Sequence, residues 1–313
     1  MKEVLLIGTG PMSYDYFKIL KSLEFNPVVV GRGHENSQKF RDEFNCKVVE
    51  GGVESFLGST EKNFDSAIVA VGINLLFDVT KSLVKAGVKN ILVEKPGALE
   101  ISEFEELSNL STEMNSNIII AYNRRFYASV IEAKKLIEED GGVTSFNFEF
   151  TEWSHILEKL EKPKVVKEKW LLGNSTHVID LAFYLGGKPK EMSSFSKGGL
   201  EWHPSSSIFS GAGITEKSSL FSYKANWESA GRWSVEVLTS KRKYIFEPVE
   251  KLQVQNRGTI NKDFHEINYT LDEEYKPGLY IQTKKFIEEN FSDMCSLGEQ
   301  LEMMKTYEKI GNY

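Results

Sequence analysis

The first third of the chain alternates short, continuously apolar runs with longer stretches in which apolar residues recur every three or four positions. Continuous apolar runs are typical of strands buried on both faces of a parallel sheet, and the longer spacing is typical of amphipathic helices. The predicted strands are Val4–Ile7, Val28–Val30, Lys47–Val49, Ala67–Val71, Asn90–Val93 and Asn117–Ala121. The predicted helices lie between them, at residues 14–23, 37–44, 76–86 and 103–114. This order predicts a doubly wound α/β domain with a parallel sheet over residues 1–122.

After about Asn123 the pattern changes, because the apolar residues of the predicted strands now alternate with polar ones. Such alternation is typical of an antiparallel sheet with one face on a core and the other wetter. The predicted strands are Ser145–Phe150, Ser219–Asn226, Trp233–Val237 and Lys243–Phe246, and helical spacing returns at residues 175–185, 280–290 and 297–310. We therefore expect a second, α+β domain over residues 123–313, whose last helices can pack back on the first.

Composition and charge narrow the class of protein. The 313 residues suffice for two domains, and 38 Lys and Arg against 45 Asp and Glu give a net charge of −7. We expect no nucleic-acid partner, because neutralising phosphates needs a basic surplus. No apolar run approaches the roughly 20 residues of a membrane span, and the N-terminal run enters a turn, unlike a signal peptide. Two cysteines, Cys46 and Cys295, make no disulfide framework or metal site. A cytoplasmic enzyme or binding protein is expected.

A glycine-containing turn, Gly8–Ser13, follows the first predicted strand and opens the first helix. In a dinucleotide-binding turn the first glycine allows the tight bend, and the second lets the backbone approach a pyrophosphate at the helix N-terminus. Ser13 stands at the third position, where a small residue still permits close packing. The alternative is a plain turn. The expected cofactor-binding residues here are Gly8, Thr9, Gly10, Pro11 and Met12.

The second strand ends at Val30 and is followed by Gly31 and Arg32, with no carboxylate before Glu35. An NAD site usually places Asp or Glu there to bind the ribose hydroxyls. The planar fork of Arg32 suits a 2′-phosphate instead. We therefore expect Gly31 and Arg32 to bind the cofactor and NADP to be preferred over NAD, the alternative being an exposed Arg32 without a ligand.

Glu94 and Lys95 follow the fifth strand. A lysine at the carboxyl end of a parallel strand points into the crevice where such sheets bind ligands. Lys95 could there hydrogen-bond a substrate hydroxyl and favour the developing alkoxide. Glu94 could orient Lys95 or contact the cofactor. Without further signals, a solvated loop lysine is the better interpretation.

These motifs, together with three others, resemble the Gfo/Idh/MocA oxidoreductase family. The segments that carry the resemblance are Gly8–Gly10, Ala70–Asn74, Val93–Pro96, Ala121–Phe126 and Thr176–Asp180. The resemblance implies an N-terminal Rossmann domain and a C-terminal domain with a large open sheet, on which a homodimer or homotetramer is often built. It implies nicotinamide-dependent redox chemistry on a sugar, polyol or related carbonyl compound. We add Val71, Gly72 and Asn74 to the expected cofactor site.

His177 lies in the first turn of a predicted helix that Asn174 or Ser175 is expected to cap, and it shares a helix face with Asp180. A histidine facing a crevice can serve as acid or base near neutral pH. The resemblance implies that His177 relays the proton of the substrate oxygen while Lys95 assists. The alternative is a histidine hydrogen-bonded for structure.

The chain departs from the family four residues before His177, where many members place an aspartate and this chain has Gly173. Glycine can neither hydrogen-bond an imidazole through a side chain nor stabilise an imidazolium. Asn174 can bind a substrate hydroxyl but supplies no charge. Either His177 works alone, or Tyr122 or a cofactor ribose hydroxyl shares the proton transfer, or the enzyme is slow.

The remaining candidates are expected to bind substrate. Arg124 or Arg125 can contact a substrate or cofactor phosphate, or form a structural ion pair, and Trp153 can stack on a sugar ring or belong to the core. The expected substrate-binding residues are Tyr122, Arg124, Asn174, Asp180 and Trp153.

The leading hypothesis is an NADP(H)-dependent oxidoreductase that acts on a secondary alcohol or ketone of a sugar, sugar nucleotide or cyclic polyol, with Lys95 and His177 as catalytic residues. The rival is a non-catalytic dinucleotide or sugar sensor that regulates a partner protein. Reduction of an imine or cyclic ketone on a non-sugar substrate would use the same residues.

Overall fold

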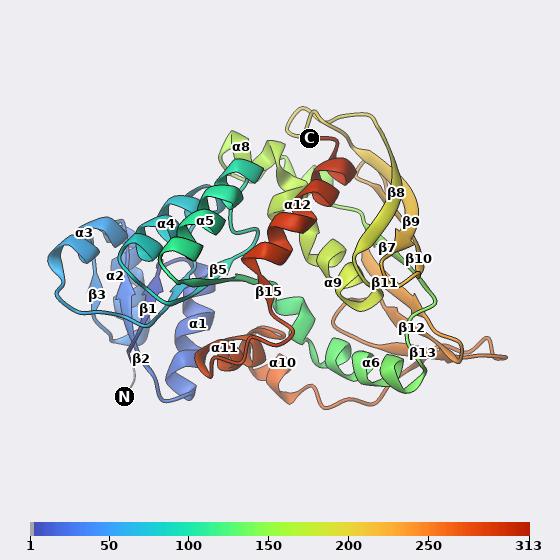
Figure 1. The fold of residues 1–313 in the computed structure, drawn as a ribbon, viewed down its shortest axis with the longest axis horizontal. Helices are drawn as coiled ribbons and strands as arrows, with labels where there is room; N and C mark the ends of the chain where they lie inside the picture. The colour runs from blue at the N-terminus through green and yellow to red at the C-terminus, as the bar shows by residue number, and fades with distance from the viewer. Residues whose placement is uncertain (1–2) are drawn as a thin grey trace. The chain divides into compact units, whose positions relative to one another are not determined.

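The computed structural model describes residues 3–313 (Figure 1). The chain divides into two compact units. The first contains the chain up to Tyr122 together with Glu274–Glu302, and the second contains Asn123–Glu273 together with Met303–Tyr313. The segment Glu274–Glu302 therefore returns to the unit that the N-terminal third builds.

The first unit is built on a seven-stranded sheet with the order β15-β6-β5-β4-β1-β2-β3. All neighbouring strands pair in parallel except β15, which pairs antiparallel with β6. The strands are β1 (Glu3–Ile7), β2 (Asn26–Val30), β3 (Val48–Val49), β4 (Ser66–Val69), β5 (Asn90–Glu94), β6 (Asn117–Ala121) and β15 (Cys295–Ser296). The helices are α1 (Pro11–Ser22), α2 (His34–Phe44), α3 (Gly52–Ser59), α4 (Leu76–Lys85), α5 (Ile101–Glu113) and α11 (Leu279–Ile287). The predicted parallel α/β architecture is confirmed.

The central strands of this sheet are buried on both faces, which explains their continuous apolar sequence. Leu5 and Leu6 of β1 point to opposite faces, and both are fully buried, as are Ile68 of β4 and Leu92 of β5. Three details differ from the prediction. Helix α3 and strand β15 were not predicted, and β4 ends at Val69 because the chain turns at Ala70, whose N–H still donates to the Ile7 carbonyl.

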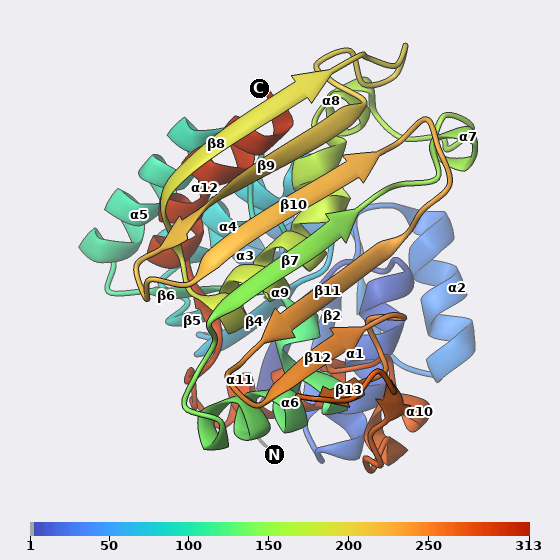
Figure 2. The same ribbon diagram turned by 90° about the vertical axis from the view of Figure 1, so that its right-hand side faces the viewer.

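The second unit is built on an eight-stranded sheet with the order β14-β13-β12-β11-β7-β10-β9-β8 (Figure 2). The strands are β7 (Ser145–Phe150), β8 (Pro189–Lys197), β9 (Ile208–Thr215), β10 (Leu220–Asn226), β11 (Trp233–Leu238), β12 (Arg242–Phe246), β13 (Gln253–Asn256) and β14 (Asp263–Phe264). Neighbours pair antiparallel except β7 and β10, which are parallel. The predicted mostly antiparallel sheet is confirmed. Strands β8, β9, β13 and β14 were not predicted; β8 carries mostly polar residues, and β14 has only two residues.

Helix α9 (Thr176–Gly186) packs on one face of this sheet and carries His177. In Figure 2 it lies behind β7 and β11. Phe183 of α9 meets Phe146 and Phe148 of β7 at ring centroid distances of 5.9 and 5.5 Å. A Cβ at Gly186 would lie 2.1 Å from the Phe146 ring, so only glycine allows this approach. These contacts fix the height and rotation of α9 on the sheet.

The remaining helical segments of this unit connect the strands. They are η2 (Asn123–Phe126), α6 (Ala128–Glu139), α7 (Ser154–Leu157), α8 (Lys164–Glu168), the π-helical turn η3 (Leu171–Ser175) and α10 (Thr270–Glu274). Helix α12 (Leu297–Gly311) starts in the first unit and ends in the second, and η1 (Ile73–Leu75) is a 3-10 turn of the first.

A buried carboxylate joins the end of α6 to the sheet. Asp140 accepts hydrogen bonds from Arg242 (2.6 Å to Oδ1), Tyr244 (2.7 Å) and Thr239 (2.8 Å). The Arg242 hydrogen bond is the largest cause that lowers the pKa of Asp140 to about 2. The cluster therefore favours the charged carboxylate in the folded state.

We expect Asp140→Asn to lower the free energy of unfolding by about 2 kcal/mol at pH 7, because the variant removes the nearer counter-ion of Arg242 and leaves only Glu139, at 3.9 Å. The folded pKa lies below the ordinary value, so this advantage of the wild type is present above about pH 4 and is lost as the pH falls toward 2. Urea denaturation at pH 7 and pH 3 measures both effects. Asp263→Asn on exposed β14 is the control and should change stability by less than about 0.5 kcal/mol. An Asp140→Asn variant as stable as the wild type at pH 7 would contradict the assignment.

Candidate active site

The turn between β1 and α1 leaves the N-terminus of α1 open. Gly8 has a φ of +121°, and a Cβ there would lie 2.3 Å from the Ala70 carbonyl oxygen, so a side chain is excluded. Gly10 is the N-cap residue of α1; no side chain caps it and the first turn carries no acidic residue. A Cβ at Gly10 would meet nothing within 4 Å. Backbone N–H groups and the helix dipole are thus available to an anion such as a pyrophosphate.

Ser13 packs as the sequence predicts for a small residue at the third position. It is fully buried, and its hydroxyl donates to the Ala70 carbonyl (3.3 Å). The segment after β4 is therefore held against the start of α1. Val71, Gly72 and Asn74 follow directly, with Asn74 in η1.

Arg32 lies exposed on the turn after β2, and its side chain makes no hydrogen bond or ion pair within residues 3–313. Two carboxylates that follow Arg32 in the chain are already engaged: Glu35 binds Lys39 (2.7 Å), and Glu50 binds Arg41 (2.5 Å) and His34 (3.1 Å). The turn thus offers a cation to the adenosine end of a dinucleotide, where an NAD site would offer a carboxylate.

Lys95 follows β5, the strand next to β4, so its backbone lies at the same edge of the sheet as the Gly8–Gly10 turn. A tight turn holds it: the Gly97 N–H donates to the Glu94 carbonyl (3.0 Å), and the Gln300 side chain donates to the Pro96 carbonyl (3.1 Å). Glu94 accepts a hydrogen bond from Tyr16 of α1 (2.7 Å), and burial raises the pKa of this carboxyl.

The candidate cofactor residues thus gather along the carboxyl ends of β1, β4 and β5, three adjacent strands, with Gly31 and Arg32 after β2 next to β1. Tyr122 follows β6, beside β5, and is buried. The open helix N-terminus, the close backbone approach at Gly8 and the exposed Arg32 fit a nicotinamide dinucleotide.

His177 is 8% exposed and lies in the first turn of α9. Its imidazole is 6.3 Å from the Trp233 ring, measured between centroids. Ser175 stands at the N-cap position of α9, one of the two positions predicted, but its side chain makes no capping hydrogen bond. Asn174 and Ser175 both belong to the preceding π turn, and Ser175 already has helical backbone angles.

Asn174 and Ser175 instead donate to a carboxylate that sequence reasoning missed. Glu152, at the end of β7 and 1% exposed, accepts from the Asn174 amide (2.9 Å) and the Ser175 hydroxyl (2.8 Å) on Oε1. Its Oε2 lies 3.6 Å from the Arg232 guanidinium. A buried carboxylate therefore holds the turn in which Gly173 replaces the family's aspartate. The sequence did contain a signal for Glu152: it occupies the next position in the series of alternating apolar residues Phe146, Phe148 and Phe150.

Asp180 is occupied by another contact. It forms two hydrogen bonds with Arg125 (2.9 and 2.5 Å), and both side chains are buried. This ion pair fastens α9 to η2. We therefore assign Asp180 and Arg125 a structural role and leave Asp180 out of the substrate site proposed below.

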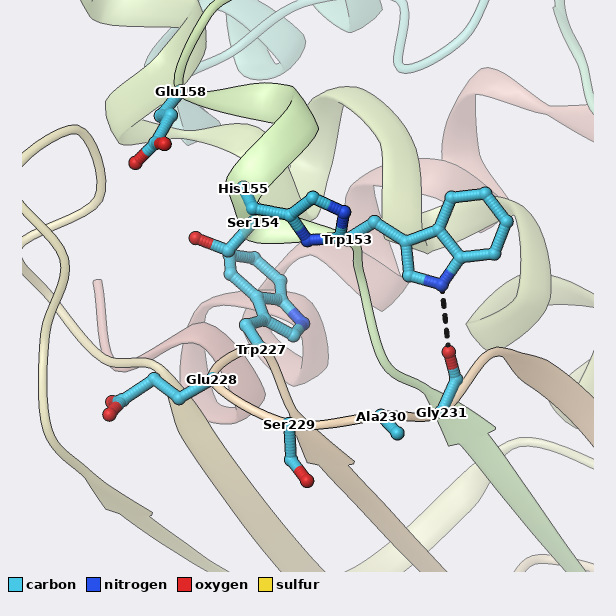
Figure 3. Close-up of a pocket in the computed structure, with 9 residues that line it drawn as sticks. All are labelled: Trp153, Ser154, His155, Glu158, Trp227, Glu228, Ser229, Ala230 and Gly231. Atoms are coloured by element: carbon cyan, nitrogen blue, oxygen red, sulfur yellow. Dashed lines mark hydrogen bonds between the residues drawn. The ribbon is translucent and has the colours of Figure 1, made fainter.

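Trp153 lies on the rim of an open pocket of about 560 Å³ (Figure 3). Its side chain is 46% exposed, and its indole N–H donates to the Gly231 carbonyl (3.0 Å). The Arg232 guanidinium lies 4.9 Å from the centroids of both Trp153 and Trp233. Arg232 thus contacts one ring that lines the pocket, Trp153, and one ring beside His177, Trp233.

Within residues 3–313, no three His, Cys, Asp or Glu side chains are grouped so that they could hold a metal ion. None of the helices described is long and apolar enough to cross a membrane. Among the described residues, Cys46 and the buried Cys295 form no disulfide.

Comparison with known proteins finds relatives in both sequence and structure. The chain is 30% identical over 115 residues to the oxidoreductase YhhX of Escherichia coli, which covers 36% of this chain and 32% of that one. The chain spans between about a third and a half of the length of the curated relatives it matches.

Two solved structures share the fold over nearly the whole chain. An oxidoreductase of Desulfitobacterium hafniense described as NADPH-dependent is similar with a TM-score of 0.82 at 16% identity, over 99% of this chain and 94% of that one. Levoglucosan dehydrogenase in complex with NADH and L-sorbose is similar with a TM-score of 0.79 at 18% identity, over 99% and 95%.

Residues 2–122 match a family model described as an oxidoreductase family with an NAD-binding Rossmann fold. The match covers the whole turn-and-strand-edge site built from β1, β2, β4 and β5. Over this N-terminal part the chain matches the NAD-binding domain of the Gfo/Idh/MocA oxidoreductase family.

Proposed function

We propose that the protein is an NADP(H)-dependent oxidoreductase acting on a secondary alcohol or ketone of a sugar, sugar nucleotide or cyclic polyol. The observation that carries this proposal is the arrangement at one sheet edge. The uncapped N-terminus of α1 and Lys95 follow strands β1 and β5, which flank β4. The bound nicotinamide would donate or accept the hydride.

Lys95 and His177 divide the remaining work in this proposal. The Lys95 ammonium hydrogen-bonds the reacting oxygen and favours its partial negative charge. His177 exchanges the proton of that oxygen. Glu152 is a positioning residue, because it accepts hydrogen bonds from Asn174 and Ser175 in the turn that leads into His177.

Two properties of the structural neighbours agree with this proposal. One neighbour is described as NADPH-dependent, and another binds NADH with a sugar and is named for a sugar substrate. Because the neighbours include both cofactors, the proposed preference for NADP rests on Arg32. We also propose that the chain forms a homodimer or homotetramer through its open sheet, where Phe195 and Leu220 are 70% and 61% exposed.

Gly173 supports a second candidate function, that of a dinucleotide or sugar sensor without catalysis. A sensor needs the cofactor turn but no acid–base pair. NADPH oxidation across a panel of ketosugars distinguishes the two, because a sensor would bind the ligands without turning them over.

We expect NADPH to bind at least about 10-fold more tightly than NADH, equivalent to about 1.4 kcal/mol, because Arg32 can pair with the 2′-phosphate. Arg32→Gln should remove most of this preference while NADH binding stays within about twofold. Isothermal titration of both cofactors measures it, with Lys39→Gln on the neighbouring helix as control. Tighter binding of NADH than of NADPH by the wild type would overturn the assignment.

Lys95→Met is expected to lower kcat by at least about 100-fold, because it removes the donor that stabilises charge on the reacting oxygen. NADPH affinity should remain within about twofold. Steady-state NADPH oxidation with a responsive ketosugar tests this, and Lys85→Met at the end of α4 serves as the matched control. Unchanged turnover in Lys95→Met would remove Lys95 from the catalytic site.

A further inference from the structure

Arg124 is a half-buried cation without a counter-ion. It lies in η2, and its Nε atom is fully buried with no hydrogen-bond acceptor in the part of the chain that the structure describes. The guanidinium forms no ion pair with any residue of 3–313. It lies over the Trp233 and Tyr127 rings, at 4.8 and 5.8 Å from their centroids. Burial lowers the pKa of Arg124, as expected for a charge removed from water.

The neighbouring arginine shows the contrast. Arg125, one position on, gives two hydrogen bonds to Asp180 and is a complete ion pair. A buried charge normally has such a partner, because the cost of desolvation is otherwise uncompensated. The aromatic rings over Arg124 offset only part of that cost.

The charged groups around Arg124 do not supply a counter-ion for its guanidinium. Glu250 and Glu152 act on it only at long range, since neither lies within the 4.0 Å of an ion pair. Arg232 adds a second positive charge over the same Trp233 ring, at 4.9 Å from its centroid. Glu152 already accepts from Asn174 and Ser175 and lies beside Arg232.

This cation pair lies next to the candidate acid–base residue. The Trp233 ring that both guanidiniums contact is also the ring beside the His177 imidazole. A ligand group that pairs with Arg124 would therefore be held one aromatic ring away from His177, within the same unit of the chain.

We propose that Arg124, assisted by Arg232, binds an anionic group of the sugar substrate, a carboxylate or a phosphate, beside His177. The inference rests on the proposed function and names its substrate class: an acidic sugar. A neutral hydroxyl could accept a hydrogen bond from Arg124 but would leave its charge uncompensated, whereas both anions match the planar guanidinium fork.

The test compares ligands that differ in charge. Isothermal titrations of the full chain at low salt would use D-glucuronate, its neutral methyl ester, D-glucose and D-glucose 6-phosphate. We expect at least one acid to bind about 10-fold more tightly than its neutral counterpart. Preference for glucuronate identifies a carboxylate site, and preference for glucose 6-phosphate identifies a phosphate site.

Variants assign the preference to Arg124. Arg124→Met should reduce it to below about twofold, Arg232→Met should reduce it in part, and Arg124→Lys should retain some of it, because the charge stays while the fork is lost. Arg257→Met, an exposed arginine of the same unit, should bind as the wild type does. Equal melting temperatures of the variants show that folding is intact.

Three results would overturn the proposal. The first is a wild type that binds no acid better than its neutral counterpart, or that binds none of these ligands. The second is an Arg124→Met variant that keeps the preference. The third is an Arg124→Met variant whose NADPH affinity falls as much as its acid affinity, which would assign Arg124 to the cofactor. Failure of the redox function would be seen separately, as absent NADPH oxidation with acidic and neutral ketosugars in a protein that still discriminates between acids and esters.

Discussion

The close approach between Gly8 and the carbonyl of Ala70 is the constraint on which the cofactor half of the molecule depends. No Cβ fits in that space, so β1 and β4 can run side by side to their ends while the chain turns into α1. Ser13 fills the remaining room and bonds the same carbonyl. The uncapped N-terminus of α1 and Lys95 therefore lie at the same edge of the sheet, the edge on which the proposed cofactor site is built.

Charge pairing organises the second unit in a comparable way. Its buried carboxylates each have partners drawn from distant parts of the chain: Asp140 from β12, Asp180 from η2, and Glu152 from the turn before α9. Each of these contacts fastens a helix or turn to its surroundings. Arg124 differs from these groups, because its buried Nε has no hydrogen-bond acceptor in the described part of the chain. Since it lies over Trp233, the ring beside His177, we interpret it as a ligand-binding residue.

Patterns that depend on neighbouring residues were predictable from the sequence, and contacts between distant residues were not. The continuous runs of β1, β4 and β5 and the alternation of β7 predicted both sheets, because burial on two faces or one is written into consecutive residues. The parallel pairing of β7 with β10 left no local signal. Ser175 has a residue type that is common at N-caps, yet its hydroxyl donates to Glu152, 23 positions away, and not to a backbone N–H of the helix. A buried carboxylate requires hydrogen-bond donors, and the sequence around Ser175 does not show that Glu152 lies there.

The glycine at position 173 acquires a different meaning once Glu152 is considered. Position 173 is glycine, where the resemblance to the Gfo/Idh/MocA family leads us to expect an aspartate, but a buried carboxylate contacts the same turn. Because one Asn174 N–H is donated to Glu152, the amide oxygen of Asn174 is oriented away from that carboxylate and remains an acceptor. A substrate hydroxyl can donate to it. The turn that leads into His177 is therefore held by a carboxylate from another part of the chain, Glu152, through the side chains of Asn174 and Ser175.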